Sequence, residues 1–238
     1  MKKLVLIITA ISFIIASCKK DNKSPIVTNQ EDPNWIKLEI PNGNVAYAVA
    51  GNIDDTLLVT TYTKAYFTTD KGKTWQESKN FNGPIQGLYT NKDTVMSLLL
   101  TGGLELEGTA KASVAEYYTL DMGKSWNRYL DYQRAQNIIK PIGIVQSAQN
   151  KVTYELKYNT KPVSANSNAY THGPTSILKD GKSLDIPFKV RIENLYMDGN
   201  DRLYVAASGG VYDQEKDTFI FKEGNTPAVV YVSRKALP

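Results

Sequence analysis

Three polar turns of the chain carry a Gly-Lys pair followed by a hydroxyl side chain, which is the core of a phosphate-binding loop. Their sequences are TTDKGKTW at residues 68–75, TLDMGKSW at residues 119–126 and KDGKSL at residues 179–184. A phosphate-binding loop also needs a glycine five residues before the glycine of that pair. Those positions hold Phe67, Tyr118 and Ser176, and the turns lie between expected strands, without a helix N-terminus to receive phosphate. The repeated turns therefore do not predict nucleotide binding.

Two carboxylates could do acid and base chemistry together. Glu105 and Glu107 lie two residues apart in LELEG, so any strand there presents both on one face. Paired carboxylates are the machinery of glycoside hydrolysis. A solvated face on a loop or edge strand explains the same pair and is the preferred interpretation, so a glycan-active enzyme stays open as the alternative.

Other catalytic and metal chemistry lacks its side chains. His172 is the only histidine and Cys18 the only cysteine, so one chain cannot build a zinc site of two or three histidines. No Asp-rich loop has the spacing of a calcium site. We predict no catalytic residue, no metal site and no cofactor. Whether the chain is an enzyme stays open, with a non-enzymatic protein favoured.

The N-terminus predicts export and a lipid anchor. Lys2 and Lys3 precede the apolar segment 4–16, which is shorter than the roughly 20 residues of a membrane span and typical of a signal peptide. The string IASC, ending at Cys18, resembles the lipobox of bacterial lipoproteins. That resemblance implies cleavage after residue 17 and a lipid on the thiol of Cys18. Because lysine rather than aspartate follows at Lys19, it also implies the outer membrane, at the cell surface or the periplasmic face.

Three segments are expected: a signal peptide at 1–17, a polar flexible tether at 18–34 and a single domain at 35–238. Removing Lys2 and Lys3 takes the formal charge from +4 to +2, too near neutral to suggest nucleic acid. The expected partners are the membrane, through the lipid, and a glycan or an envelope protein.

Four units of similar strands follow one another in this domain. Their first strands are VAYAVAGN, IQGLYTNK, IGIVQSAQN and IENLYMDGN, and a polar turn and a second strand follow each one. Runs rich in Val, Leu, Thr and Tyr between such turns indicate strands. Units of four strands and roughly 40 to 50 residues are what propeller blades need. The prediction is an all-β chain forming a small β-propeller. Five blades are favoured, the last shared by both termini, and four blades are the alternative.

Two of the turns resemble the Asp-box of bacterial neuraminidase repeats. The matching residues are Asp70, Gly72, Thr74 and Trp75 in the first copy and Asp121, Gly123, Ser125 and Trp126 in the second. Asp-box proteins are mostly β-propellers, including sialidases and sortilin-like receptors, with the box on the hairpin between the two outer strands of a blade. The residues support a structural role, because aspartate can accept N–H groups of its own turn and glycine supplies positive φ. We expect the tryptophans to pack between neighbouring blades.

Sialidase activity, the known activity of this family, requires an arginine triad and a Phe/Tyr-Arg-Ile-Pro motif. That motif is absent, and the nearest string, residues 190–193, lacks the proline. Arg191 within it is interpreted as a residue of a blade edge.

Two insertions, at 101–115 and 158–176, are candidates for ligand-binding loops, because long loops are often functional. The second combines aromatic, amide and hydroxyl groups that suit sugar or peptide recognition. Its candidate residues are Tyr158, Asn166, Asn168, Tyr170 and His172. The sequence thus favours a binding or assembly module that presents loops on a propeller.

Overall fold

The computed structural model describes residues 32–41, 43–81, 83–100, 110–130, 137–165, 168–222 and 226–237. These residues belong to one compact unit, Glu31–Pro238. All regular structure within these ranges is β-strand, and none of it is a helix long and apolar enough to cross a membrane. The predicted signal peptide, Cys18 and most of the predicted tether lie outside the described residues.

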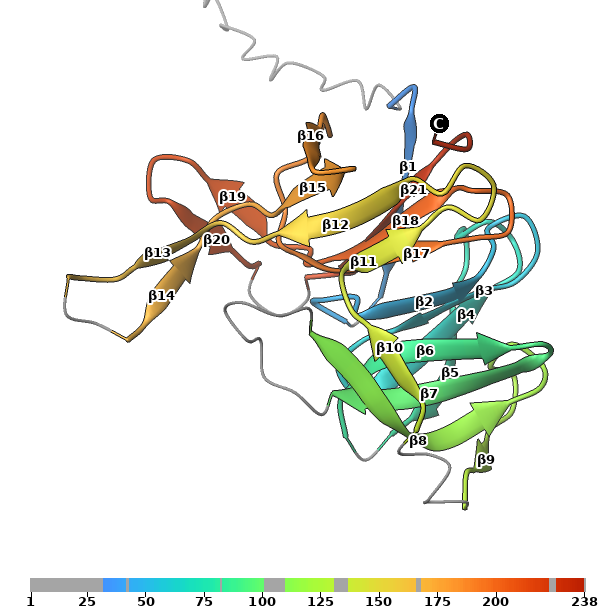
Figure 1. The fold of residues 1–238 in the computed structure, drawn as a ribbon. Helices are drawn as coiled ribbons and strands as arrows, with labels where there is room; N and C mark the ends of the chain where they lie inside the picture. Colours follow the sequence, from blue (N-terminus) through green and yellow to red (C-terminus); the bar gives the residue numbers. More distant parts are fainter. Residues whose placement is uncertain are drawn as a thin grey trace, which may run out of the picture. The chain divides into compact units, whose positions relative to one another are not determined.

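Four antiparallel sheets, here called blades I to IV, make up the unit (Figure 1). Blade I holds β2 (Ala48–Gly51), β3 (Leu57–Thr60), β4 (Lys64–Thr68) and β5 (Gln76–Asn80). Blade II holds β6 (Ile85–Asn91), β7 (Thr94–Leu100) and β8 (Lys111–Thr119), with β9 (Asn127–Arg128) and β10 (Ile139–Pro141) along its outer edge. Blade III holds β11 (Ile144–Gln146), β12 (Thr153–Lys157), β15 (Ser176–Lys179) and β16 (Lys182–Leu184). Blade IV holds β17 (Ile192–Met197), β18 (Leu203–Ala207), β21 (Ala228–Ser233) and β1 (Trp35–Ile40).

Two further hairpins are inserted between second and third strands. They are β13 (Thr160–Pro162) with β14 (Tyr170–His172) in blade III, and β19 (Val211–Asp213) with β20 (Thr218–Ile220) in blade IV.

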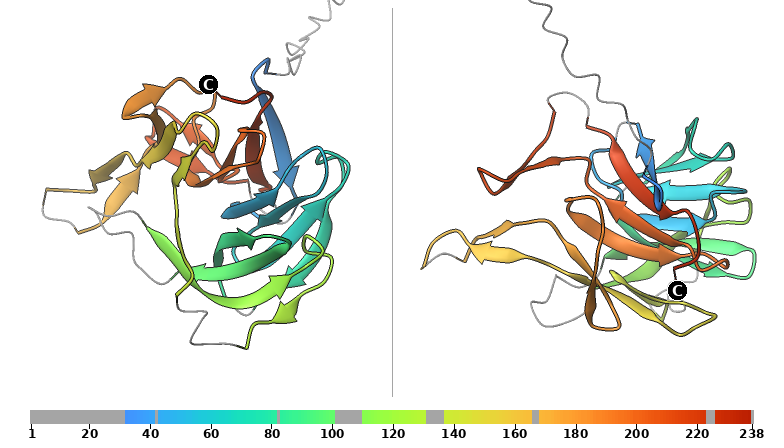
Figure 2. Two further views of the ribbon diagram at one scale, coloured as in Figure 1. Left: turned by 45° about the vertical axis from the view of Figure 1, so that its right-hand side comes forward. Right: turned by 90° about the horizontal axis from the view of Figure 1, so that it is seen from above.

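The blades surround a common axis, so the unit is a small β-propeller, as predicted (Figure 2). The first strand of each blade lies innermost. The ring is closed by β1, which pairs antiparallel with β21, from Trp35 opposite Ser233 to Ile40 opposite Ala228. Closure by both termini leaves no open gap between the first and last blades. The favoured count of five blades is not confirmed, because the described strands form four, the stated alternative.

The difference from five blades arises in the last unit. The four-strand pattern of the units predicts that the chain after the second strand of this unit forms its third and fourth strands. That stretch instead forms the separate hairpin β19–β20, and β21 and β1 take the two outer places beside β18. This arrangement depends on the pairing of β1 with β21, at the two ends of the chain, and local sequence patterns do not predict that pairing.

Clusters of apolar side chains fill seams between blades. Blades IV and I share a buried cluster around Leu38, Val59 and Val230, and blades III and IV share one around Tyr154 and Val205. Blades I and II share a third cluster that includes Leu58, Phe81 and Leu88. Burial of this kind is the main stabilising term in a chain without a disulfide.

The axis of the ring is crossed by polar side chains. Asn194 on β17 donates from Nδ2 to the Gln86 carbonyl of blade II at 3.2 Å, and its Oδ1 accepts the Gly143 N–H of blade III at 2.9 Å. Lys140 donates from Nζ to the Leu88 carbonyl at 2.6 Å, and burial lowers its pKa to about 8. Buried polar groups are kept where they are hydrogen-bonded. Asn194 therefore links blades II, III and IV across the centre, and Lys140 joins β10 to β6 within blade II.

The two complete Asp-containing turns have the same internal hydrogen bonds. In the first, Asp70 accepts the Thr74 N–H at 2.9 Å and the Thr74 hydroxyl at 2.6 Å, while Thr68 Oγ1 accepts the Gly72 N–H. In the second, Asp121 accepts the corresponding two groups of Ser125 at 2.8 and 2.7 Å. Both turns join the third and fourth strands of a blade, between β4 and β5 and between β8 and β9.

A tryptophan after each turn lies at the start of an outermost strand. Trp126 packs against the cluster shared by blades I and II, with its ring edge-on to Phe81 at 5.2 Å. Its Nε1 donates to Ser78 Oγ at 2.7 Å, and Ser78 in turn donates to the Gly123 carbonyl. The equivalent Nε1 of Trp75 is buried without a hydrogen-bond partner among the described residues.

In the part of the chain that the structure describes, the Trp75 Nε1 lacks an acceptor because β1 of blade IV carries a leucine at the position where β5 of blade I carries a serine. Ser78 stands three residues after Trp75, and Leu38 stands three residues after Trp35 on β1. A Cβ added at Gly72 would meet Leu38 Cδ2 at 2.7 Å, and one added at Gly123 would meet Ser78 Oγ at 3.3 Å. Leu38 thus occupies the place of the acceptor and offers none.

We expect Ser78→Ala to lower the free energy of unfolding by about 1–3 kcal/mol, because it leaves the Trp126 Nε1 and the Gly123 carbonyl without partners. Urea denaturation followed by circular dichroism measures this. Ser183→Ala, at an exposed serine on β16, should change the value by less than about 0.5 kcal/mol. Equal effects of the two substitutions would mean that the two hydrogen bonds of the Ser78 hydroxyl do not contribute to the free energy of unfolding.

The Asp-containing turns predict a pH dependence of stability. Hydrogen bonds from Thr74 lower the pKa of Asp70 to about 2, and those from Ser125 do the same for Asp121. Since these folded-state pKa values lie below the unfolded value of about 3.9, the stabilisation is present above pH 4 and is lost as the pH falls toward 2. The double variant D70N/D121N should therefore have a lower Tm at pH 7 and a smaller drop in Tm between pH 5 and pH 2. Asp185→Asn, which removes an exposed carboxylate outside both turns, should leave the drop at its wild-type size.

Candidate functional site

The two ends of the ring differ in what they present. At one end, here called the mouth, the innermost strands begin and the second strand of each blade connects to the third. Backbone hydrogen bonds join these segments, for example Ile85 N–H to the Tyr62 carbonyl and Ser208 N–H to the Arg191 carbonyl. Both inserted hairpins project from this end (Figures 1 and 2). The Asp-containing turns lie at the opposite end, together with the turns between first and second strands.

Exposed apolar side chains gather at the mouth. The large hydrophobic residues that are exposed on the connections from second to third strands are Tyr62, Tyr158, Val163, Tyr170, Val211, Ile220 and Phe221. Elsewhere in the described residues, only Leu120, Leu130 and Ile139 belong to this group. Clusters of exposed apolar residues mark interaction sites more often than residues scattered singly.

An ion pair occupies the start of the innermost strand of blade IV. Arg191 Nε lies 2.8 Å from Glu193 Oε1, and the Glu193 side chain is 15% exposed. Burial raises the pKa of Glu193, and the Arg191 guanidinium opposes that rise. A partly buried Arg–carboxylate pair at a mouth is a candidate recognition element, because perturbed titratable groups concentrate at functional sites.

Aromatic side chains from two other blades are influenced by the charges of this pair. Burial and the charge of Glu193 raise the pKa of Tyr47, in blade I, and raise that of Tyr158, in blade III, to about 12. Burial and the charge of Arg191 lower the pKa of His172 on β14. These effects place the three rings within electrostatic range of the pair. At pH 7 both tyrosines are protonated and His172 is neutral.

The two inserted hairpins are fixed to each other. Lys161 Nζ on β13 lies 2.7 Å from Asp217 Oδ2, beside β20, and the Tyr212 hydroxyl donates to the other oxygen of that carboxylate. Tyr212 and Phe219 pack as a cross-strand pair with ring centroids 5.3 Å apart. The hairpins of blades III and IV therefore form one continuous border of the mouth.

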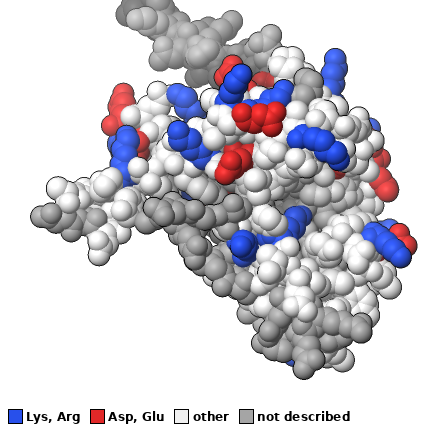
Figure 3. All heavy atoms as spheres, in the orientation of Figure 1, with Lys and Arg blue, Asp and Glu red and all other residues white. Residues whose placement is uncertain are grey.

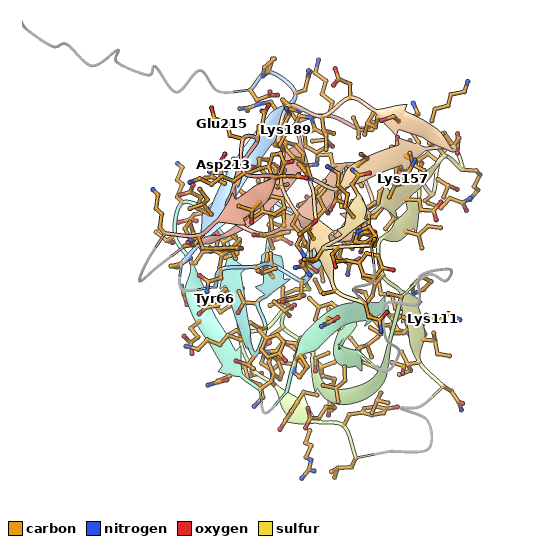
Figure 4. All side chains as sticks on the ribbon, turned by 90° about the vertical axis from the view of Figure 1, so that its left-hand side faces the viewer. Tyr66, Lys111, Lys157, Lys189, Asp213 and Glu215 are labelled. Carbon is orange, nitrogen blue, oxygen red and sulfur yellow. The ribbon has the colours of Figure 1, made fainter. Side chains whose placement is uncertain are left out.

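The surface charge is mixed. On the side shown in Figure 3, positive and negative side chains alternate over the upper blades. In the view onto the mouth, Lys111 and Lys157 lie toward one side of the ring, and Lys189, Asp213 and Glu215 lie together toward the other (Figure 4). Neither view shows a field of one sign.

The structure brings together some of the predicted ligand-binding residues. Tyr158 and His172 lie at the mouth, and Tyr170 shares a face of β14 with His172. Asn168 is exposed next to β14, on the same hairpin. Asn166, Glu105 and Glu107 fall outside the described residues.

Tyr47 and Glu193 are members of this site that the sequence did not predict. Arg191, interpreted from the sequence as a residue of a blade edge, lies directly before β17, which is the inner edge strand of its sheet. A charged pair flanking Ile192 at the start of an inner strand was the available signal.

The described arginines do not converge. Arg202 lies at the opposite end, where it pairs with Asp54 at 2.5 Å and Asp198 at 3.2 Å. Arg128 lies on β9, next to the second Asp-containing turn, and Arg234 follows β21. Within the described ranges no arginine triad forms, and no group of three metal-ligating side chains is found.

The third Gly-Lys turn borders a surface hollow of about 440 Å³. Its lining residues are Lys179, Asp180, Lys182, Ser183, Leu184 and Asp185. Two lysines and two aspartates balance in charge there, and Asp180 is engaged by the Thr153 N–H at 2.9 Å. The hollow therefore offers no positive site for phosphate.

No family model matches the chain, and no curated protein matches it. Among solved structures, it is similar to one described as "YCF48 bound to D1 peptide", at 12% sequence identity. That match covers 79% of this chain and 71% of that chain, with a TM-score of 0.27.

Proposed function

We propose that this protein is a lipid-anchored binding or assembly module of the bacterial outer membrane, that it is not an enzyme, and that its ligand surface is the mouth of the propeller. One observation carries the proposal: the long connections, the exposed apolar side chains and the Arg191–Glu193 pair gather at one end of the ring. The opposite end carries short, internally hydrogen-bonded turns. Loops on a rigid scaffold are the usual location of binding residues.

The anchoring part of the proposal rests on the IASC string and the apolar segment before it. Metabolic labelling with an alkyne fatty acid should label the wild-type chain in the outer-membrane fraction, and Cys18→Ser should abolish the label. Labelling of the serine variant would contradict a lipid on Cys18. Two or more acyl chains suffice for stable anchoring.

The binding part is tested by capture from envelope extracts after cross-linking. The double variant Y158A/R191A should lose the cross-linked products of the wild type, whereas L120A/K92A, at the opposite end, should keep them. Loss of the cross-linked products in the second variant alone would contradict the proposal, because it would place the ligand surface at the end that carries the Asp-containing turns. Steady release of reducing sugar from glycans by the purified protein would contradict a non-enzymatic role.

A further inference from the structure

We propose that the mouth binds a neutral oligosaccharide, with sugar faces on the tyrosine rings and hydroxyl groups on the Arg191–Glu193 pair. This inference rests on the proposed function, because it names the ligand class of the same site. Four features of the mouth lead to it: charge balance, protonation, ring exposure and depth.

The charges at the centre cancel. Arg191 and Glu193 pair directly at 2.8 Å, so the pair itself offers no net charge to attract an anion or a cation. A guanidinium carries five N–H donors and a carboxylate about four acceptor positions, and one contact uses only a few of them. The remaining groups can bind adjacent hydroxyls of one sugar with charge-assisted hydrogen bonds, which are stronger than neutral ones.

The surrounding groups are neutral and can both donate and accept. The raised pKa values of Tyr47 and Tyr158 keep their hydroxyls protonated, and the lowered pKa of His172 keeps its ring uncharged at pH 7. A protonated phenol and a neutral imidazole each offer one donor and at least one acceptor. Sugar hydroxyls, which also donate and accept, match such groups.

Exposed tyrosine side chains lie on different blades of the propeller. Tyr62 in blade I is 55% exposed and packs near Tyr47, with ring centroids 6.0 Å apart. Tyr158 and Tyr170 in blade III are 38% and 42% exposed. Tyrosine combines an apolar face with a polar edge, as a sugar ring does. The exposed aliphatic pair Val211 and Ile220 lies on the β19–β20 hairpin, at the border of the mouth.

The depth of the site favours an oligomer. Asn194, one residue after Glu193 on β17, crosses the axis and bonds to Gln86 of blade II and Gly143 of blade III. A ligand is thereby held across the mouth and not along the channel. Several sugar units in a row can contact tyrosines of blades I and III, whereas one unit cannot.

Isothermal titration of the purified full chain with neutral hexasaccharides (cellohexaose, xylohexaose, mannohexaose and maltohexaose) tests the inference. Binding of at least one of them is expected, with the matching monosaccharide at least about tenfold weaker. Tyr158→Ala and Glu193→Gln should each weaken binding at least about tenfold, and Tyr158→Phe, which keeps the ring, should weaken it less. Leu120→Ala, at the opposite end, should leave binding unchanged.

Charged probes separate this inference from the proposed function. Hexagalacturonate and acidic or basic hexapeptides should bind at least about tenfold more weakly than the best neutral sugar. Tight binding of a charged probe that Tyr158→Ala abolishes would overturn the ligand class and leave the mouth as the binding surface. Binding of a neutral sugar that no mouth variant changes would overturn both. Circular dichroism of each variant separates lost binding from lost folding, and Tyr158 is exposed and lies outside the buried core.

Discussion

Replacing Trp126 by alanine is expected to lower the free energy of unfolding by about 3 kcal/mol. The indole packs on the cluster shared by blades I and II, meets Phe81 edge-on at 5.2 Å and donates to Ser78 at 2.7 Å. Alanine would remove the apolar contact, the ring pair and the hydrogen bond at one seam, and leave a cavity. Urea denaturation with a shared baseline for both proteins measures the difference.

Leu120→Ala is the control for Trp126→Ala. Leu120 belongs to the same turn segment but is 61% exposed, so its loss should change stability by no more than about 0.5 kcal/mol. A cost below about 1 kcal/mol for Trp126→Ala would show that the indole does not join the two blades.

Alanine at Gly123 is expected to cost about 2–4 kcal/mol, the sum of a backbone term and a steric term. Gly123 has φ near +91°, a conformation that costs other residues about 1–2 kcal/mol. An added Cβ would also lie 2.6 Å from Leu58 Cδ1 of the neighbouring blade, which is closer than real contacts allow. The seam between blades I and II would have to open or repack.

Gly181→Ala separates the two terms. Gly181 occupies the third Gly-Lys turn with φ near +77°, and an added Cβ there would meet nothing within 4 Å. It should therefore cost only the backbone term, about 1–2 kcal/mol. Equal costs at the two glycines would contradict close packing of the second turn against blade I.

The all-β propeller could be predicted from the sequence because its signals are local. Strand-length runs between polar turns recur four times, and the hydrogen bonds of Asp70 and Asp121 join groups within five residues.

The blade count and most of the candidate site could not be predicted in this way. Whether residues 209–219 complete a blade depends on competition with β21 for the edge of β18, a pairing set by distant parts of the chain. Tyr158 and His172 were recognisable because they lie in a long polar insertion. Arg191 and Glu193 pair locally at an ordinary strand start, and only the closure of the ring brings Tyr47 of blade I near them.

The most direct test of a binding mouth is site-specific photo-crosslinking in intact cells that produce the full chain. A benzoylphenylalanine replaces Tyr62 or Tyr170 at the mouth, or Leu120 at the opposite end, since all three side chains are exposed. The account predicts discrete adducts, with glycan or protein, from positions 62 and 170 and none from position 120. Adducts from position 120 alone would contradict it.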